Sequence, residues 1–129
     1  MVIDTSALLA IFLAEAEREP FLNAIISAPV CLLSAANLLE TGIVLEARRG
    51  AALGREFDLF VYRAALQIVP VDADQVEIAR RAWRMFGKGR HPAALNFGDC
   101  FAYALARSSG EPLLAKGEDF RRTDVQLVV

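Results

Sequence analysis

The chain has 129 residues, close to the commonest size of a single domain, so we expect one domain over residues 1–129 and no second module. Its 14 basic and 16 acidic residues give a formal net charge of -2, which excludes attraction of the whole molecule to nucleic acid and leaves only local patches. Hydrophobic residues make up 55% of the chain, above the roughly 45–50% usual for soluble chains, which suggests that a partner covers some apolar surface.

In the first half of the chain, predicted strands and helices alternate. In chain order they are a strand ending at Ile3, a helix from about Ala7, a helix over residues 19–28, a strand over residues 30–33 and a long helix from Ser34 to Arg49. Pro29 and Gly50 are typical of helix ends. The long helix carries apolar residues at helical spacing, namely Leu38, Leu39, Ile43, Val44 and Leu45.

The second half continues the alternation. In chain order we predict a helix over residues 53–65, a strand over residues 68–71, a helix over residues 73–86, a loop over residues 87–95, a helix over residues 96–109, a strand over residues 113–115, a turn over residues 116–119 and a final strand over residues 125–129. The strands are apolar throughout and separated by helices, which predicts an α/β fold, a three-layer α/β/α sandwich with a mostly parallel central sheet. Ligands bind beyond the carboxyl ends of such strands, where Asp4 and Asp119 are expected.

The remaining composition predicts an intracellular setting. The two cysteines, Cys31 and Cys100, are far apart and outside any C-x-x-C pattern, so they predict neither a disulfide framework nor a zinc site. The apolar run from Ala7 to Ala14 lacks a preceding basic region, and we interpret it as a core helix and not a signal peptide. No apolar stretch approaches the ~20 residues of a membrane span. We therefore expect a cytoplasmic protein.

Two acidic residues lie in apolar helical surroundings. Glu40 has Ile43 and Val44 three and four residues on, so it shares an apolar stripe, and a buried carboxylate there needs a partner. Asp99 has a similar setting in the first turn of its helix, although interaction with the helix dipole would by itself explain an acid there. A cap alone would likewise explain Asp4.

A cluster of such acids would need a cation. Bringing two carboxylates to about 4 Å costs on the order of 4 kcal/mol at an effective dielectric of about 20, so the group must take up protons or bind a positive ion. Mg²⁺ and Mn²⁺ prefer oxygen ligands and usually keep several waters, one of which can be activated for attack on phosphorus.

Four short segments that together span nearly the whole chain resemble the motifs of PIN-domain ribonucleases, and are closely similar to those of VapC toxins. They are Val2-Ile3-Asp4-Thr5-Ser6-Ala7-Leu8, Leu38-Leu39-Glu40, Asn96-Phe97-Gly98-Asp99-Cys100-Phe101-Ala102-Tyr103-Ala104, and Lys116-Gly117-Glu118-Asp119-Phe120 with Thr123-Asp124. The resemblance implies a Mg²⁺- or Mn²⁺-dependent endoribonuclease, the toxin of a toxin–antitoxin pair. It also implies that the catalytic acids are Asp4, Glu40, Asp99 and Asp119.

The resemblance further implies a role for each acid. Asp4, Asp99 and Asp119 would coordinate one or two divalent ions, and Glu40 would be a ligand or would orient the attacking water. Hydrolysis would leave a 5′ phosphate and a 3′ hydroxyl. Asp124 is a rival for the fourth acidic position, although a turn residue would also explain it.

Supporting roles in such a site fall to several polar side chains. Ser6 is expected to hydrogen-bond the carboxylates or a metal-bound water, although a helix cap explains it equally well. Lys88, Arg90 and Lys116 lie close to the acids in sequence and could hold RNA phosphates, unless they belong to solvated loops. We expect no zinc site or general base at His91, the one histidine. Aromatic residues are spaced as core or interface residues and not as a stacking platform, namely Trp83, Phe86, Phe97 and Tyr103.

By resemblance, the partners would be an RNA substrate, a cognate VapB-like antitoxin and a second copy of the chain. An antitoxin arginine reaching the acids would inhibit cleavage. Two other classes stay open. One is a PIN-like module that binds RNA or protein without catalysis. The other is a Mg²⁺-dependent phosphoryl-transfer domain, whose phosphatase members would need a second acid where this chain has Ser6.

Overall fold

A four-stranded parallel sheet lies at the centre of the computed structural model, which describes residues 1–128. Its strands are β1 (Val2–Ile3), β2 (Leu32–Ser34), β3 (Gln67–Val69) and β4 (Leu113–Leu114). They are arranged in the order β3-β2-β1-β4, and every pair is parallel. Val2 of β1 pairs with Leu32 on one side and Leu113 on the other, so β1 is fully enclosed.

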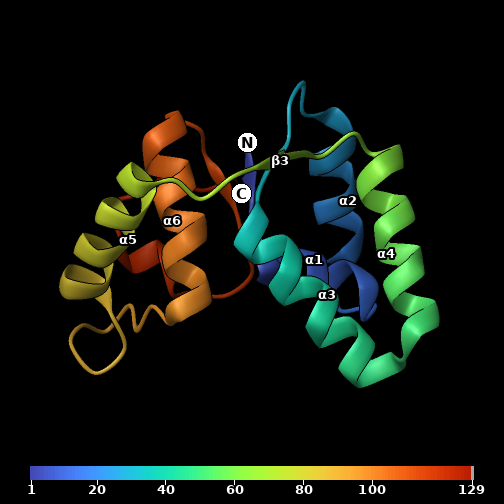
Figure 1. Cartoon of the computed structure of the whole chain (residues 1–129), viewed down its shortest axis with the longest axis horizontal. Coiled ribbons are helices and arrows are strands. Elements are labelled where there is room, and N and C mark those ends of the chain that lie inside the picture. Colours follow the sequence, from blue (N-terminus) through green and yellow to red (C-terminus); the bar gives the residue numbers. More distant parts are fainter. Residues whose placement is uncertain (129) are drawn as a thin grey trace.

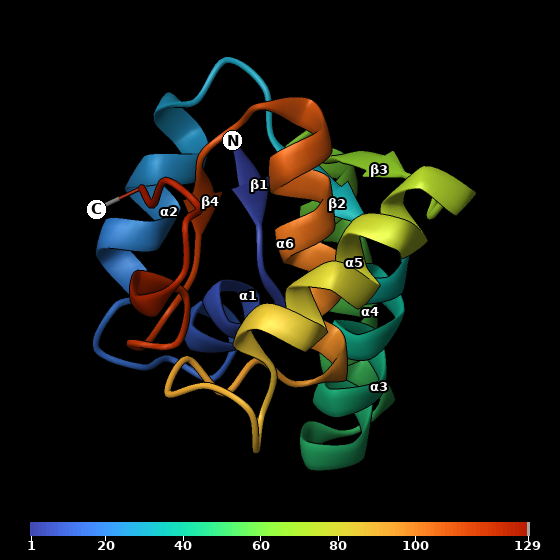
Figure 2. The same cartoon turned by 90° about the vertical axis from the view of Figure 1, so that its left-hand side faces the viewer.

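Helices cover both faces of this sheet (Figures 1 and 2). They are α1 (Thr5–Phe12), α2 (Arg18–Ser27), α3 (Ala35–Arg49), α4 (Ala51–Arg63), α5 (Ala73–Phe86) and α6 (Phe97–Ser109), with a short 3₁₀ helix η1 (Phe120–Arg122). Figure 1 shows α5 and α6 on one side and α1 to α4 on the other. The predicted three-layer α/β/α sandwich is therefore confirmed.

Each face of the sheet has its own hydrophobic core. Val2 and Leu113 point into the cluster beneath α5 and α6, whereas Ile3 and Leu114 point into the cluster beneath α1 to α4. Successive side chains of a strand point to opposite faces, so a strand covered on both sides must be apolar at every position. This is why β1 and β4 lack the apolar–polar alternation of a half-exposed sheet.

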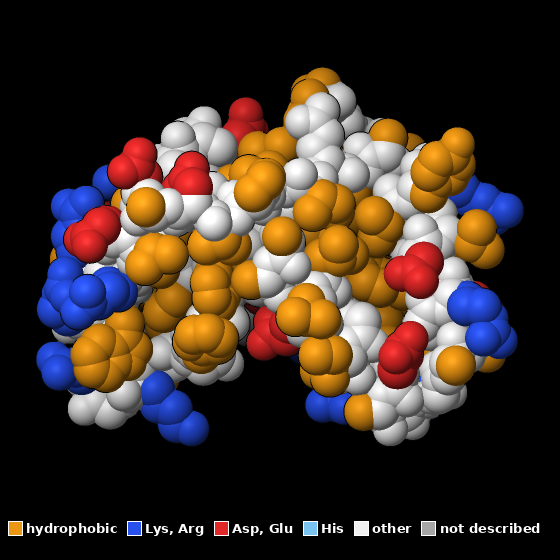
Figure 3. Space-filling model, viewed as in Figure 1, with side chains coloured by type: hydrophobic (Ala, Val, Ile, Leu, Met, Phe, Trp, Pro, Cys, Tyr) orange, Lys and Arg blue, Asp and Glu red, His pale blue; other side chains and the backbone are white. Residues whose placement is uncertain are grey.

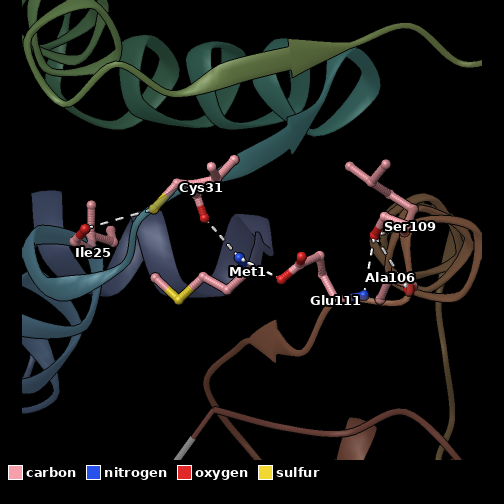
Figure 4. A network of polar contacts seen from close by, with 8 residues as sticks. Met1, Ile25, Cys31, Ala106, Ser109 and Glu111 are labelled. Atoms are coloured by element: carbon pink, nitrogen blue, oxygen red, sulfur yellow. Dashed lines mark hydrogen bonds and ion pairs between the residues drawn. The ribbon is translucent and has the colours of Figure 1, made fainter.

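The amino terminus is fixed at the head of β1 (Figure 4). The Met1 ammonium donates to the Val30 carbonyl oxygen at 2.8 Å and lies 3.1 Å from a Glu111 carboxylate oxygen. Cys31 beside it is buried and free, with its thiol donating to the Ile25 carbonyl, and Cys100 is also buried and free, as expected. Within residues 1–128, no helix has the length and apolar character needed to cross a membrane.

The predicted final strand over residues 125–129 is wrong in extent. Leu127 forms only an isolated parallel bridge with Leu113, and Val129 lies outside the described residues. The Leu113 amide donates to the Gln126 carbonyl and the Val128 amide to the Leu113 carbonyl, both at 2.8–2.9 Å. The 3₁₀ turn and bends before this segment direct it along β4 for one residue pair only.

The apolar stripe of α3 is divided between the core and the surface, because Leu45 belongs to the core and Leu38 packs against it, whereas other members face outward. The buried residues of α3 are Asn37, Thr41 and Leu45, whereas Leu39 is 64% exposed and Ile43 is 58% exposed. The covered side of α3 packs on α4, α1, β2 and the start of α6, so the helical period identified an apolar side but not which part of it is covered. An apolar stripe left uncovered is available to a partner.

Candidate active site

Asp4 is a buried carboxylate at the junction of β1 and α1. It is 2% exposed, and as the N-cap of α1 its Oδ2 atom accepts from the Ser6 amide at 3.0 Å. Its Oδ1 atom is buried and has no hydrogen-bond partner within the described chain. Burial raises the pKa of Asp4 to about 7; hydrogen bonding from Ser6 opposes the rise, and the charges of Asp99 and Glu40 add to it.

Glu40 reaches from α3 to the start of α6. Its Oε1 atom accepts from the Thr5 hydroxyl at 2.5 Å and from the Asn37 amide at 3.3 Å. The carboxylate lies directly against Gly98, where an added Cβ would be 2.3 Å from Oε2. Glycine at position 98 therefore makes room for the Glu40 carboxylate at the positively polarised end of α6.

Asp99 lies in the first turn of α6, next to that contact. It forms a reciprocal capping box with Asn96: the Asp99 amide donates to Asn96 Oδ1 at 2.9 Å, and Asp99 Oδ2 accepts from the Asn96 amide at 3.0 Å. The pKa of Asp99 is raised to about 6, mainly by burial and also by the charges of Asp119 and Glu40, while the hydrogen bond from Asn96 opposes the rise. The helix-dipole explanation is thus incomplete, because Asp99 also closes a capping box and lies within reach of the charges of two other acids.

The two rivals for the fourth acidic position lie in different surroundings. Asp119 is exposed at the start of η1, makes no capping hydrogen bond, and acts on Asp99 through its charge. Asp124 instead accepts from the Tyr103 hydroxyl at 2.6 Å and lies 3.8 Å from an Arg107 nitrogen. The side chain of Asp124 is therefore already engaged by α6.

Ser6 and Lys116 connect the carboxyl ends of β1 and β4. The Lys116 amide donates to the Ser6 hydroxyl oxygen at 2.9 Å, which fixes the start of the turn that carries Asp119. The Lys116 ammonium pairs with Glu15 and, at 3.4 Å, with Glu17, and the hydrogen bond to Glu15 raises the pKa of Lys116. Lys116 is thus paired with acids of its own chain and does not present a free positive charge.

A basic surface lies over α5 and the loop that follows it. Five basic side chains between residues 80 and 90 are exposed, and no acid occurs from residue 78 to residue 98. They are Arg80, Arg81, Arg84, Lys88 and Arg90. Figure 3 shows basic side chains gathered at this end of the molecule. The sequence interpretation included only Lys88 and Arg90, although the run Arg80-Arg81-Ala82-Trp83-Arg84 was a visible signal.

The aromatic residues divide between the core and the surface. Tyr103 is buried and Phe86 packs against the core of α5 and α6, whereas Trp83 is 44% exposed and Phe97 is 81% exposed. The Arg90 guanidinium lies 4.2 Å from the centre of the Trp83 ring. His91 Nδ1 accepts from the Ala93 amide at 3.0 Å, which gives the imidazole a role within the loop.

The acids suit a hydrated divalent ion better than a closed metal cage. Within residues 1–128, no three His, Cys, Asp or Glu side chains are close enough together to hold an ion by themselves. The unpartnered Oδ1 atom of Asp4 nevertheless leaves a buried acceptor beside Asp99 and Glu40, and every donor is a hard oxygen. Mg²⁺ and Mn²⁺ accept one or two carboxylates and fill the remaining positions with water, so the residues fit such an ion.

Three residues that the sequence interpretation did not assign to the site contribute to it. Thr5 and Asn37 donate to Glu40, and Gly98 accommodates its carboxylate. Thr5 and Gly98 belong to the family motifs, but the sequence around them did not indicate their contacts with Glu40. Asn37 carried one signal, a polar residue one turn before Glu40 in a largely apolar helix.

The model of the PIN domain family matches residues 1–126. The chain belongs to the PIN-domain family. It is 56% identical over 128 residues to a protein named Ribonuclease VapC of Mycolicibacterium smegmatis, with 99% of each chain covered. PIN-domain ribonucleases of the VapC type are generally dependent on a divalent metal ion.

Two solved structures share its fold. The structure of VapC20 of Mycobacterium tuberculosis, described as a sarcin-ricin loop cleaving toxin, superposes with a TM-score of 0.80 at 24% identity and covers 98% of this chain and 97% of its own. VapBC2 of Rickettsia felis, bound to a DNA fragment from its promoter, gives a TM-score of 0.75 at 13% identity over 98% and 96% of the two chains. At these identities the likeness concerns the fold, and it confirms the expected PIN-like architecture.

Proposed function

We propose that this chain is the toxin of a toxin–antitoxin pair and acts as an endoribonuclease that hydrolyses RNA phosphodiester bonds. The observation that carries the proposal is the junction of β1, α3 and α6, where the buried Asp4 carboxylate and the partly exposed Glu40 and Asp99 carboxylates come together. The relative named Ribonuclease VapC, 56% identical over almost the full length of both chains, supports the same activity. The single PIN-like domain over residues 1–129 would supply the whole site.

The proposed roles follow the surroundings of each acid. Asp4, Asp99 and Asp119 would hold Mg²⁺ or Mn²⁺, which when bound would stabilise negative charge on the phosphate and make a water more acidic. Glu40 has one oxygen fixed by two donors, so its other oxygen is free to orient the attacking water or to act as a ligand. Asp119 is preferred to Asp124, whose carboxylate is bonded to Tyr103.

RNA would approach over the basic surface of α5. Lys88 and Arg90 keep their proposed role, and three exposed arginines of α5 adjoin them, namely Arg80, Arg81 and Arg84. Lys116 is better explained as a residue that fixes the turn of Asp119, because its ammonium is paired with Glu15 and Glu17. A net charge of -2 is compatible with RNA binding when the basic residues gather on one side.

The partner would be a VapB-like antitoxin, and we propose that the toxin also forms a homodimer in the cytoplasm. The exposed apolar face of α3 and α6, formed by Leu39, Ile43, Phe97 and Phe101, supports contact between copies. These residues line a hollow of about 320 Å³ that also contains Glu40, so any partner seated there would lie beside the acids. Figure 3 shows the hydrophobic side chains around this hollow.

The test is cleavage of total bacterial RNA by antitoxin-free protein in Mg²⁺, Mn²⁺ or EDTA. Asp4→Asn and Asp99→Asn are assayed beside the wild type, and the ends of all products are mapped. We expect metal-dependent cuts with 5′ phosphate and 3′ hydroxyl ends, absent from both variants. Equal inertness of the wild type and both variants, with RNA still bound, would favour the binding-module alternative over the nuclease.

A further inference from the structure

Asn37 is a fully buried amide at the meeting point of three elements. It lies on α3 with 0% of its surface exposed. Its Nδ2 atom donates to the Thr5 hydroxyl oxygen at 3.2 Å, to Glu40 Oε1 at 3.3 Å and to the Gly98 carbonyl oxygen at 3.1 Å. One side chain therefore joins the start of α1, the acid of α3 and the first turn of α6.

The surrounding acceptors fix the orientation of this amide. An Asn side chain has two N–H groups on one atom, and here they serve three oxygens. Turning the amide over would place Oδ1 against a carbonyl and a carboxylate oxygen, which repel it. In the observed orientation, the Thr5 hydroxyl accepts from Asn37 and donates in turn to Glu40 at 2.5 Å, so both donors act on the same carboxylate oxygen.

The arrangement is not what stability alone would favour. The Oδ1 atom of Asn37 is buried and has no hydrogen-bond partner within the described chain. A buried acceptor left unsatisfied destabilises the folded state and offsets part of what the three donated hydrogen bonds contribute to stability. The amide is therefore better explained by the groups it positions than by its contribution to folding.

We propose that Asn37 is a positioning residue of the active site, which holds the Glu40 carboxylate against Gly98 and so sets its place relative to Asp99. The Gly98 carbonyl belongs to the residue immediately before Asp99, so the amide fixes both acids at once. This inference rests on the proposed nuclease function. It assigns to Asn37 no contact with substrate, and its effect passes through Glu40.

The test is a double-mutant cycle between Asn37 and Glu40. Asn37→Leu, Glu40→Gln and the double variant are compared with the wild type in the initial rate of total-RNA cleavage in Mg²⁺. We expect Asn37→Leu to slow cleavage by roughly tenfold or more, as loss of a ligand-orienting partner commonly does. We expect little further loss in the Glu40→Gln background, because a residue that acts through Glu40 has nothing left to position.

A second readout does not depend on RNA. Mn²⁺ is titrated into the metal-free proteins by calorimetry, and Asn37→Leu is expected to weaken binding in the wild-type background more than in the Glu40→Gln background. The matched control is Thr41→Val, one turn further along the same buried side of α3, since the Thr41 hydroxyl donates only to the Asn37 backbone carbonyl. Thr41→Val should leave the cleavage rate and Mn²⁺ binding unchanged.

If Asn37→Leu slows cleavage by the same factor in the wild-type and Glu40→Gln backgrounds, the inference is overturned and Asn37 has a general structural role. If the wild type is active and the two losses are additive, only the role of Asn37 is contradicted and the nuclease function stands. If the wild type neither cleaves RNA nor binds Mn²⁺, the nuclease function and the role of Asn37 are both contradicted. If Asn37→Leu does not fold, Thr5→Val takes its place in the cycle, because it removes the other donor to the same Glu40 oxygen. Additive losses from Thr5→Val and Glu40→Gln would also contradict the positioning of Glu40 by these donors.

Discussion

At the scale of single residues, the candidate site combines one buried acid, Asp4, with partly exposed acidic neighbours. Asp4 is almost completely enclosed, and both its remaining acidic neighbours and its burial favour the protonated form. A group whose pKa is higher in the folded than in the unfolded state stabilises the fold below its unfolded pKa, and this contribution is lost as the pH rises through the folded value. Near neutral pH, Asp4 therefore lowers the free energy of unfolding of the metal-free protein.

We predict that the free energy of unfolding of the metal-free protein falls as the pH rises from about 4 to about 7. The window follows from the ordinary aspartate pKa of 3.8 and the folded pKa of about 7 for Asp4, and the loss should be on the order of a few kcal/mol. Asp4→Asn should remove most of this dependence, with a smaller part left by Asp99. Urea unfolding in EDTA across this range would measure it, and an unchanged slope in the variant would contradict the assignment.

A second prediction concerns Gly98. Replacing a helical glycine by alanine usually stabilises a helix by about 0.5–1 kcal/mol, but here the new Cβ would meet Glu40 Oε2 at 2.3 Å. Gly98→Ala should displace Glu40 or α6 and slow RNA cleavage by roughly tenfold or more. Gly42→Ala is the control, because that glycine of α3 has nothing within 4 Å of an added Cβ. It should gain stability and keep full activity; equal activities of the two variants would show that the Glu40 contact is dispensable.

At the scale of elements, each candidate acid comes from a different segment, and all four segments meet near the carboxyl ends of the strands. β1 delivers Asp4, α3 delivers Glu40, the first turn of α6 delivers Asp99, and the turn after β4 delivers Asp119. Parallel strands place their carboxyl ends together, which is why residues far apart in sequence meet there. The backbone contact between Lys116 and Ser6 holds the last of these segments in place.

We predict opposite results for the two candidate fourth acids. Asp119→Ala should reduce RNA cleavage strongly with little change in stability, since its side chain makes no capping hydrogen bond. Asp124→Ala should keep most of the activity but destabilise the fold by about 1–3 kcal/mol, because the buried Tyr103 hydroxyl loses its acceptor. Cleavage rates and urea midpoints for both variants decide between them, and loss of activity in Asp124→Ala alone would reverse the assignment.

At the scale of the whole molecule, charge and apolar surface are unevenly distributed. The basic surface occupies α5, while the exposed apolar face lies on α3 and the start of α6 (Figures 1 and 3). A face of this kind on a small protein usually marks contact with a partner. The two surfaces give separate predictions for RNA and for protein association.

The first concerns RNA binding. In the inactive Asp99→Asn background, Arg84→Ala with Lys88→Ala should weaken binding to total RNA and lower the slope of log affinity against log salt by about 0.7 per lost phosphate contact. Arg55→Ala with Arg63→Ala removes the same charge from exposed positions of α4 and should have a much smaller effect. Filter binding at several salt concentrations measures both slopes. If the two double variants have equal salt slopes, α5 does not contact the RNA.

The second concerns self-association. Phe97→Asp should shift the antitoxin-free protein toward the monomer in light scattering, because Phe97 is 81% exposed within the apolar face. Tyr62→Asp is the matched control, since Tyr62 is 84% exposed on α4. A wild type that is monomeric at high concentration would contradict the homodimer, and a dimer that survives Phe97→Asp would place the interface elsewhere.

The sequence by itself determined the alternation of strands and helices and the doubly covered parallel sheet, and it supplied the candidate acids of the site. These follow from local properties, namely apolar runs, helical periodicity, capping residues and family motifs. Composition also indicated surplus apolar surface, and part of the α3 stripe, Leu39 and Ile43, is indeed exposed. A period specifies that one side of a helix is apolar, but the packing of other elements decides what covers it.

Only the tertiary structure decided which side chains meet. Thr5, Asn37 and Gly98 are separated by up to 93 positions, yet all three contact Glu40 or its partners, because α1, α3 and α6 converge at one edge of the sheet. The same convergence places Asp119 near Asp99 and leaves Asp124 on Tyr103. Local patterns report propensity and burial along one element, whereas the distance between two side chains depends on how separate elements pack, which no single segment of the chain encodes.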